Sequence, residues 1–182
     1  VMPARDRFVV DNRRGGADDQ LFMIFDRCDI ERIRRAAGRA HQQQGARSRH
    51  FLARQAGRVV GVESSEEALR DALRNCAENR AEGCRFAPGD AGAVLRQLFR
   101  QGERFDAAVA DPPRAGVHPE ALRALIDLGP PRIVYVSCNP AALATDLTRL
   151  LAAGYRAERA RLVDLFPQTA HCETVVKLVK RG

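Results

Sequence analysis

From residue 51 onward the sequence alternates between short apolar runs and amphipathic stretches, and this alternation most constrains the fold. The apolar runs predict strands, and the amphipathic stretches predict helices. Such alternation is typical of the α/β class, with a parallel sheet and right-handed crossovers. The predicted strands are 58–62, 84–87, 105–110, 132–136, 157–165 and 174–179, and the predicted helices are 65–80, 91–100, 118–128 and 141–153.

The last two predicted strands have no helix between them, which indicates an antiparallel edge pair. Residues 1–50 have a different character, because only 21–25 (LFMIF) is a credible strand and 29–40 is compatible with a basic helix. We therefore divide the chain into an atypical basic segment over 1–50, disordered or disrupted, and a domain over 51–182.

The net charge of +7 arises from 30 Lys and Arg against 23 Asp and Glu, and it is unevenly distributed. Residues 1–58 hold 13 arginines and seven acids, a net of +6, whereas the rest hold 17 basic and 16 acidic side chains. Such an excess is typical of an arm that binds nucleic acid, or of a segment unrelated to the rest of the chain.

Several protein classes are disfavoured by what the sequence lacks. No apolar run approaches the ~18 residues of a membrane span, and the first residues have no signal-peptide core. The five cysteines are odd in number and show no CxxC spacing. We therefore expect reduced thiols in a cytoplasmic protein, with neither a disulfide framework nor a bound metal.

Residues that directly follow the predicted strands are the first functional candidates, because ligands of open α/β sheets bind beyond the carboxyl ends of the strands. This rule selects Glu63, Asp90, Asp111 and Cys138. A carboxylate at Glu63 could accept hydrogen bonds from both hydroxyls of a ribose, or it could simply be an acid near a helix N-terminus. The stiff turn DPPR (111–114) suits the reading of a planar base edge, or it is an ordinary end to a strand.

Two later segments carry a candidate nucleophile and a candidate base. SCNP (137–140) places Cys138 on a strand-to-helix turn, where a helix N-terminus would lower the thiol pKa; a buried, inert cysteine is the alternative. FPQTAHCE (166–173) brings His171, Cys172 and Glu173 to one rim. We disfavour a hydrolase or a metal site there, because no oxyanion loop or metal-ligand spacing accompanies these residues.

Five segments together resemble one known family: RVVGVESSEEAL (58–69), FDAAVADPPRAGVHPE (105–120), RIVYVSCNPAALATDL (132–147), LLAAGY (150–155) and VDLFPQTAHCETVVKL (163–178). In this order and at this spacing, the chain closely resembles the RNA 5-methyluridine (uracil-C5) methyltransferases, which use S-adenosylmethionine. DPPRAG, SCNP and DLFPQTxHxE in one chain are far more specific than any of the three alone.

The resemblance implies a class I methyltransferase fold, a Rossmann-like seven-stranded sheet with helices on both faces and an antiparallel last strand. It implies that Cys138 is the nucleophile that adds to C6 of uracil and that Glu173 is the base that removes the C5 proton. The substrate it implies is a uridine in tRNA or rRNA, flipped out of its stack to reach the thiol.

The resemblance also implies a set of binding residues. Asp111, Arg114 and His171 would contact the uridine. Glu63 would bind the cofactor ribose, with Asp90 near the adenine and Asp111 also on the cofactor side. No iron–sulfur cluster is expected in this chain.

Departures from the family pattern lie in the basic first third. Where the family has a central strand followed by a glycine-rich cofactor loop, residues 41–50 are HQQQGARSRH, with Gly45 as their one glycine. We therefore expect a sheet that is incomplete at its first strand, in a chain disrupted by a shifted reading frame or in a fragment. In the rival interpretation, 21–25 supplies a substitute central strand and cofactor binding persists in altered form.

Three functions follow from these observations. The first is methylation of uridine C5 in RNA, and the second is a catalytically inactive remnant that at most binds RNA. The third is methylation of an exocyclic amine, which a DPP turn also suits but which SCNP and Glu173 disfavour.

Overall fold

The computed structural model describes residues 21–26, 57–78, 83–164, 168 and 172–182. Within these residues the strands are β1 (Leu21–Asp26), β2 (Arg58–Glu63), β3 (Cys84–Pro88), β4 (Ala107–Asp111), β5 (Arg132–Ser137), β6 (Tyr155–Val163) and β7 (Glu173–Lys180). The helices are α3 (Glu66–Glu78), α4 (Ala91–Arg100), α5 (Pro119–Leu128) and α6 (Pro140–Ala152).

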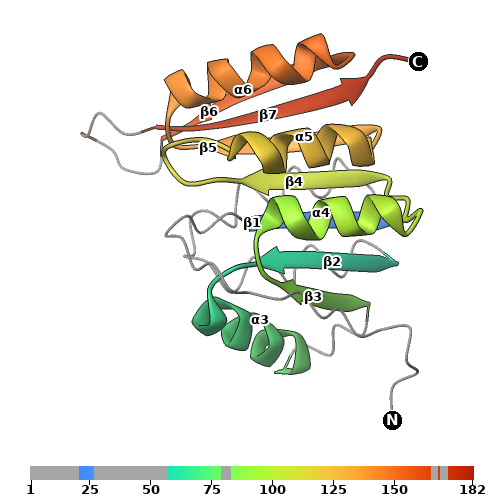
Figure 1. Ribbon diagram of the computed structural model, residues 1–182. Coiled ribbons are helices and arrows are strands. Elements are labelled where there is room, and N and C mark those ends of the chain that lie inside the picture. Colours follow the sequence, from blue (N-terminus) through green and yellow to red (C-terminus); the bar gives the residue numbers. More distant parts are fainter. Residues whose placement is uncertain (1–20, 27–56, 79–82, 165–167, 169–171) are drawn as a thin grey trace.

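The described strands form one seven-stranded sheet in the order β3-β2-β1-β4-β5-β7-β6 (Figure 1). β2 and β3 are parallel, as are β4 and β5. β7 is antiparallel to both β5 and β6. The predicted α/β class and the predicted antiparallel pair at the end of the chain are both confirmed.

Strand β1 lies inside the sheet, between β2 and β4, but it is antiparallel to both of these neighbours. Phe22 pairs with Val62 of β2 and with Ala110 of β4, each time in antiparallel register. A strand between two others needs an apolar run, and LFMIF supplies one. The sheet is therefore not incomplete at its first strand. Residues 21–25, which the rival interpretation proposed as a substitute strand, occupy the position between β2 and β4 and run antiparallel to both.

Helices cover both faces of the sheet, as predicted. Figure 1 shows α4, α5 and α6 over one face, and α4 packs directly against α5. Each of these three helices connects strands that advance in the same direction across the sheet, so right-handed crossovers place them together. α3 connects β2 to β3 in the opposite direction, which places it on the other face.

Local sequence explains where the helices begin and end. Asp90 caps α4 by accepting a 2.8 Å hydrogen bond from the backbone N–H of Ala93. α5 has proline in its first turn and ends at Gly129, which adopts the left-handed conformation with a φ of 66°. The predicted helix 91–100 coincides with α4, and the other predicted elements from residue 58 onward differ by at most two residues at either end. The prediction for 29–40 lies outside the described residues.

The main hydrophobic core lies between the sheet and helices α4 to α6. Its largest fully buried side chains include Tyr135, Tyr155 and Leu95. The Tyr155 hydroxyl donates a 2.8 Å hydrogen bond to the backbone oxygen of Pro130, so its polar atom is satisfied within the core. Burial raises the pKa of Tyr155 to about 12.

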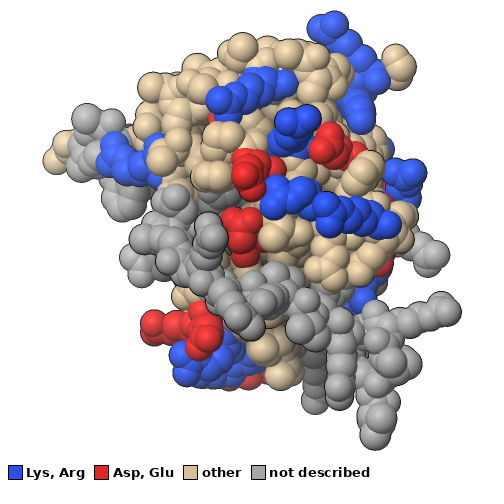
Figure 2. All heavy atoms as spheres, viewed as in Figure 1, with Lys and Arg blue, Asp and Glu red and all other residues tan. Residues whose placement is uncertain are grey.

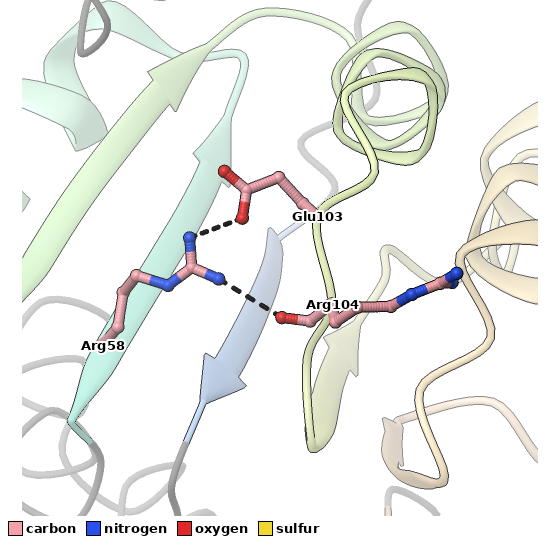
Figure 3. Close-up of polar contacts among 3 residues, drawn as sticks. All are labelled: Arg58, Glu103 and Arg104. Carbon is pink, nitrogen blue, oxygen red and sulfur yellow. Dashed lines mark hydrogen bonds and ion pairs between the residues drawn. The ribbon is translucent and has the colours of Figure 1, made fainter.

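Arg58 joins the two halves of the sheet at the edge where β2 begins (Figure 3). Its guanidinium donates at 2.6 Å to the Glu103 carboxylate and at 3.2 Å to the backbone oxygen of Arg104. It also lies 4.8 Å from the centre of the Phe105 ring. Because β1 separates β2 from β4, this cluster connects β2 to the segment that leads into a strand with which β2 does not pair.

The described cysteines are thiols: Cys76, Cys84, Cys138 and Cys172. Burial, and secondarily the neighbouring Cys76, raise the pKa of Cys84 to about 12. No described helix is long and apolar enough to cross a membrane. The described residues also contain no group of three or more His, Cys, Asp or Glu side chains that could hold a metal ion.

Candidate active site

Sheet topology brings most of the predicted site residues to one edge. Glu63 ends β2, Asp111 ends β4, and Cys138 directly follows β5. These three strands share one direction, so their carboxyl ends lie at the same edge. β7 runs the other way, and therefore its first residue, Glu173, lies at this edge as well.

Cys138 and Glu173 are neighbours across the β5–β7 ladder. The last register pair is Ser137 with Thr174, so the next position along places Cys138 beside Glu173. The Glu173 side chain is 4% exposed, and Cys138 is only partly covered. A partly accessible thiol thus lies beside a buried carboxylate, an arrangement suited to a nucleophile and a proton acceptor.

Electrostatics at Cys138 differ from the prediction made from the helix N-terminus. Burial, followed by the Glu173 charge and to a smaller degree the Asp111 charge, raises the pKa of the Cys138 thiol. The backbone N–H of Cys138 and the Arg114 cation act in the opposite direction but do not outweigh them. The predicted lowering of this pKa is therefore wrong, because the helix N-terminus competes with burial and two carboxylates.

Hydrogen bonds fix the turn on which Cys138 lies. The Ser137 hydroxyl accepts at 3.1 Å from the backbone N–H of Asn139 and donates at 3.0 Å to its carbonyl oxygen. The Asn139 side chain caps α6 by accepting from the N–H of Ala141 at 3.1 Å. The residues on both sides of the thiol are therefore held in place by hydrogen bonds within the chain.

The loop after β4 is tied to this turn. The side-chain amide of Asn139 donates a 2.8 Å hydrogen bond to the backbone oxygen of Arg114. Within the loop, the N–H of Gly116 donates to the oxygen of Pro113 at 2.9 Å. The loop that carries Asp111 and Arg114 is thus fixed relative to Cys138. The Arg114 side chain itself is exposed.

Asp146 of α6 anchors the same loop, although it is not among the predicted site residues. Its Oδ2 accepts hydrogen bonds from the backbone N–H of Val117 at 2.8 Å and from the Tyr135 hydroxyl at 2.5 Å. The side chain is 3% exposed. Spacing could have revealed it, because Asp146 lies on the helical stripe of the buried Leu143 and Leu150.

On the other side of the edge lie the predicted cofactor residues. Glu63 is 3% exposed, and its Oε1 accepts a 3.1 Å hydrogen bond from the N–H of Ser65. Asp90 is exposed and serves as the cap of α4. Glu63 pairs with Pro88 of β3, and its backbone oxygen accepts from the N–H of Gly89, which links it to the turn that carries Asp90.

Because β1 is antiparallel to β2 and β4, the start of β1 rather than its end lies between Glu63 and Asp111. Leu21 pairs with Asp111, so the chain enters β1 at this edge and leaves it at the other, where Asp26 pairs with Arg58. The 41–50 segment belongs to the connection between Asp26 and Arg58, and both described ends of that connection lie at the edge away from Glu63. The buried Glu63 carboxylate thus lies at one edge, whereas the described end of β1 lies at the opposite edge.

The structure thus gathers Cys138, Glu173, Asp111 and Arg114 around one turn, with Glu63 and Asp90 on the far side of β1. His171 lies outside the described residues. What these positions do chemically stays a prediction.

The chain is similar in sequence to known RNA methyltransferases. The family model for tRNA (uracil-5-)-methyltransferase matches residues 49–181. An RNA methyltransferase from Geobacter sulfurreducens is 46% identical over 131 residues, which are 72% of this chain and 26% of that protein. An RNA methyltransferase from Porphyromonas gingivalis is 47% identical over 133 residues, covering 72% and 29%. This chain therefore spans less than a third of the length of these relatives.

Solved structures agree with the sequence match. The tRNA (uracil-54, C5)-methyltransferase of Pyrococcus abyssi, in complex with S-adenosyl-L-homocysteine, superposes with a TM-score of 0.62 at 37% identity. The superposition covers 71% of this chain and 31% of that one. An rRNA methylase from Streptococcus thermophilus has a TM-score of 0.57 at 15% identity, covers 74% and 80%, and supports the fold alone.

Proposed function

We propose that this chain, which belongs to the tRNA (uracil-5-)-methyltransferase family, carries the catalytic residues of an enzyme that methylates C5 of uridine in RNA. The observation that carries the proposal is the juxtaposition of Cys138 and Glu173 across the β5–β7 ladder. Asp111 and Arg114 also act on this thiol electrostatically, which supports assigning all four residues to one site.

Uracil C5 is a weak nucleophile, and the chemistry of this site addresses that weakness. The Cys138 thiolate adds to C6, which moves electron density to C5 as an enolate-like carbon able to accept a methyl group. Once C5 carries the methyl group, the Glu173 carboxylate removes the C5 proton, the C5–C6 double bond re-forms, and the Cys138 sulfur leaves C6. The two groups are both required, because addition without proton removal leaves the enzyme bound to its RNA.

The remaining residues orient the reacting partners. Asp111 presents its carboxylate at the end of β4 to hydrogen-bond the uracil edge, and Arg114 and His171 contact the uridine. Glu63 and Asp90 are the residues that would hold S-adenosylmethionine, which supplies the methyl group when bound. Support for this cofactor comes from the Pyrococcus abyssi relative, whose structure contains S-adenosyl-L-homocysteine.

Nucleoside analysis after reaction with S-adenosylmethionine and unmodified tRNA or rRNA transcripts tests the proposal. We expect 5-methyluridine with the unaltered chain, none with Cys138→Ala, and an RNA–protein adduct that accumulates with Glu173→Gln. Cys172→Ala is the matched control and should retain activity. Methylation that persists in Cys138→Ala, or a methyl group on a base nitrogen, would refute the assignment.

A second candidate function, an RNA-binding remnant without methyl transfer, is favoured by one observation. The central strand runs antiparallel, so no loop after it begins beside Glu63. Calorimetric titration with S-adenosylmethionine separates the two candidates. Binding in the micromolar range that is lost in Glu63→Ala supports the enzyme, whereas no heat at millimolar ligand supports the remnant.

A further inference from the structure

We propose that one face of β6 binds the phosphate backbone of RNA and leads the strand to the site at Glu173. The inference rests on the proposed function for the nature of the polyanion. The location of the surface rests on the fold, because β6 is the outermost described strand of the sheet.

Strand register collects five basic side chains on this face. Arg156, Arg159 and Arg161 pair with Val179, Lys177 and Val175, which are alternate residues of β7, and an irregularity at Glu158 keeps the three arginines in phase. Arg132 of β5 pairs with Val179 from the other side. We call this set the β6 basic face: Arg132, Arg156, Arg159, Arg161 and Lys177.

Two arginines of the β6 basic face remain available to an external anion. Glu158 already pairs with Lys177 at 2.6 Å and with Arg156 at 3.6 Å. Within the described part of the chain, no carboxylate lies within ion-pair distance of Arg159 or Arg161. Both side chains are exposed, and guanidinium groups match phosphate oxygens in charge and in their forked geometry.

Arg156, Arg159 and Arg161 form a row along β6, the arginine row, that leads toward the candidate site. Val163 pairs with Glu173, and Arg161 and Arg159 precede Val163 on the same face at successive steps of about 7 Å. Beyond Glu173, the Arg114 cation acts on Cys138 from the loop after β4. Positive side chains therefore flank the site on two sides, as a path for a phosphate backbone requires.

The opposite face of the molecule, formed by α4 to α6, carries charged side chains of both signs (Figure 2). Figure 2 shows basic and acidic side chains interspersed over α4 to α6. Arg96 and Glu120 pair there at 3.2 Å. The β6 basic face is thus distinguished by three arginines that follow one another in register along a single strand, although residues 59–182 as a whole are nearly neutral.

Charged side chains on an edge strand can also serve to prevent pairing with other chains. Substitution by glutamate separates the two roles, because it keeps the edge charged while reversing its attraction for phosphate. Arg159→Glu/Arg161→Glu is therefore the test variant. Arg123→Glu/Arg149→Glu, which alters two exposed arginines of α5 and α6 by the same total charge, is the matched control.

Binding of a fluorescent, unmodified tRNA transcript to the full chain is measured by anisotropy over a range of salt concentrations. We expect the test variant to lower the slope of log K against log salt by about 1.4–1.8 and to weaken binding at least about 25-fold at 0.1 M salt. Arg159→Gln/Arg161→Gln, which loses the same two cations, should show the same reduction in slope as the test variant. The control pair should keep most of the affinity and the slope.

Equal losses of tRNA affinity in the test and control variants would overturn the proposal. An unchanged salt slope in both the glutamate and the glutamine variants of Arg159 and Arg161 would overturn it as well. Circular dichroism of each variant verifies that the fold is retained. Because tRNA binding involves no methyl transfer, the two proposals fail separately. An arginine-row effect without 5-methyluridine formation refutes only the methylation, and methylation without an arginine-row effect refutes only the docking surface.

Discussion

The half of the sheet around β4, β5 and β7 differs from the half around β1, β2 and β3 in how firmly the predicted site residues are held. Around β4 and β5, the loop after Asp111 and the turn that carries Cys138 are fixed by the Asn139 and Asp146 hydrogen bonds, and Glu173 is buried beside them at the start of β7. Around β1, β2 and β3, Glu63 is buried in position, but the strand beside it runs in the inverted direction. The proposed nucleophile and base thus lie in a hydrogen-bonded framework, whereas the proposed cofactor residue Glu63 lies beside a strand that begins at this edge and ends at the other.

The comparison also shows that strand position and strand direction are separate properties. β1 pairs along its length with both β2 and β4, and so it can stabilise the sheet whichever way it runs. Direction matters for function, because it decides which loop reaches the carboxyl edge. A chain can therefore retain a stable sheet while its cofactor side is altered.

The largest expected effect concerns this central strand. Met23→Pro removes a backbone donor from a strand that pairs on both sides, and we expect a loss of about 3 kcal/mol or more in the free energy of unfolding. Urea unfolding followed by circular dichroism provides the measurement. Met23→Leu, which leaves the backbone ladder intact, is the control and should cost less than about 1.5 kcal/mol.

An unchanged urea midpoint in Met23→Pro would break the comparison, since the β4–β5–β7 half would then be stable without β1. A loss shared equally by Met23→Leu would instead point to side-chain packing rather than backbone pairing.

A smaller effect is expected in the β4–β5–β7 half. Gly116 has a φ of 89°, and a Cβ there would lie 2.8 Å from Oδ2 of Asp146. Gly116→Ala should therefore cost about 2 kcal/mol or more, from backbone strain together with the displaced carboxylate. Gly102 has a φ of 71° with nothing within 4 Å of the added Cβ, so Gly102→Ala reports the backbone strain alone, about 1 kcal/mol.

Equal losses of stability in Gly116→Ala and Gly102→Ala would show that Asp146 yields readily and that the loop after β4 is not rigidly held. A larger loss in Gly116→Ala, accompanied by slower alkylation of Cys138, would tie the Asp146 anchor to the site.

Much of the architecture could be predicted because it is written in local patterns. The run 91–100 has an acidic cap before it and an apolar stripe within it, and α4 has those bounds. The direction of β1 could not be predicted in the same way, since LFMIF is equally apolar read from either end. It depends on pairing with residues distant in sequence, β2 and β4.

Site chemistry shows the same division. The position of Cys138 at a strand-to-helix turn follows from SCNP, but the pKa shift of its thiol depends on Glu173, which is 35 residues away along the chain. Asp146 lay within a predicted helix, yet its role emerged only when the structure placed Val117 and Tyr135 beside it. Local patterns identified the residues, whereas their electrostatics and partners required the tertiary fold.

The smallest expected effect is a shift in the titration of Cys138. The Glu173 charge raises the pKa of this thiol and the Arg114 charge lowers it. Glu173→Gln should therefore move the midpoint of iodoacetamide alkylation at Cys138 to lower pH, and Arg114→Gln should move it to higher pH. Peptide mass spectrometry distinguishes Cys138 from the other cysteines. Arg123→Gln, on α5, should leave the midpoint unchanged. An unchanged midpoint in both of the first two variants would mean that burial alone sets the thiol pKa, and the β4–β5–β7 site would then lack the electrostatic coupling between Cys138 and its charged neighbours.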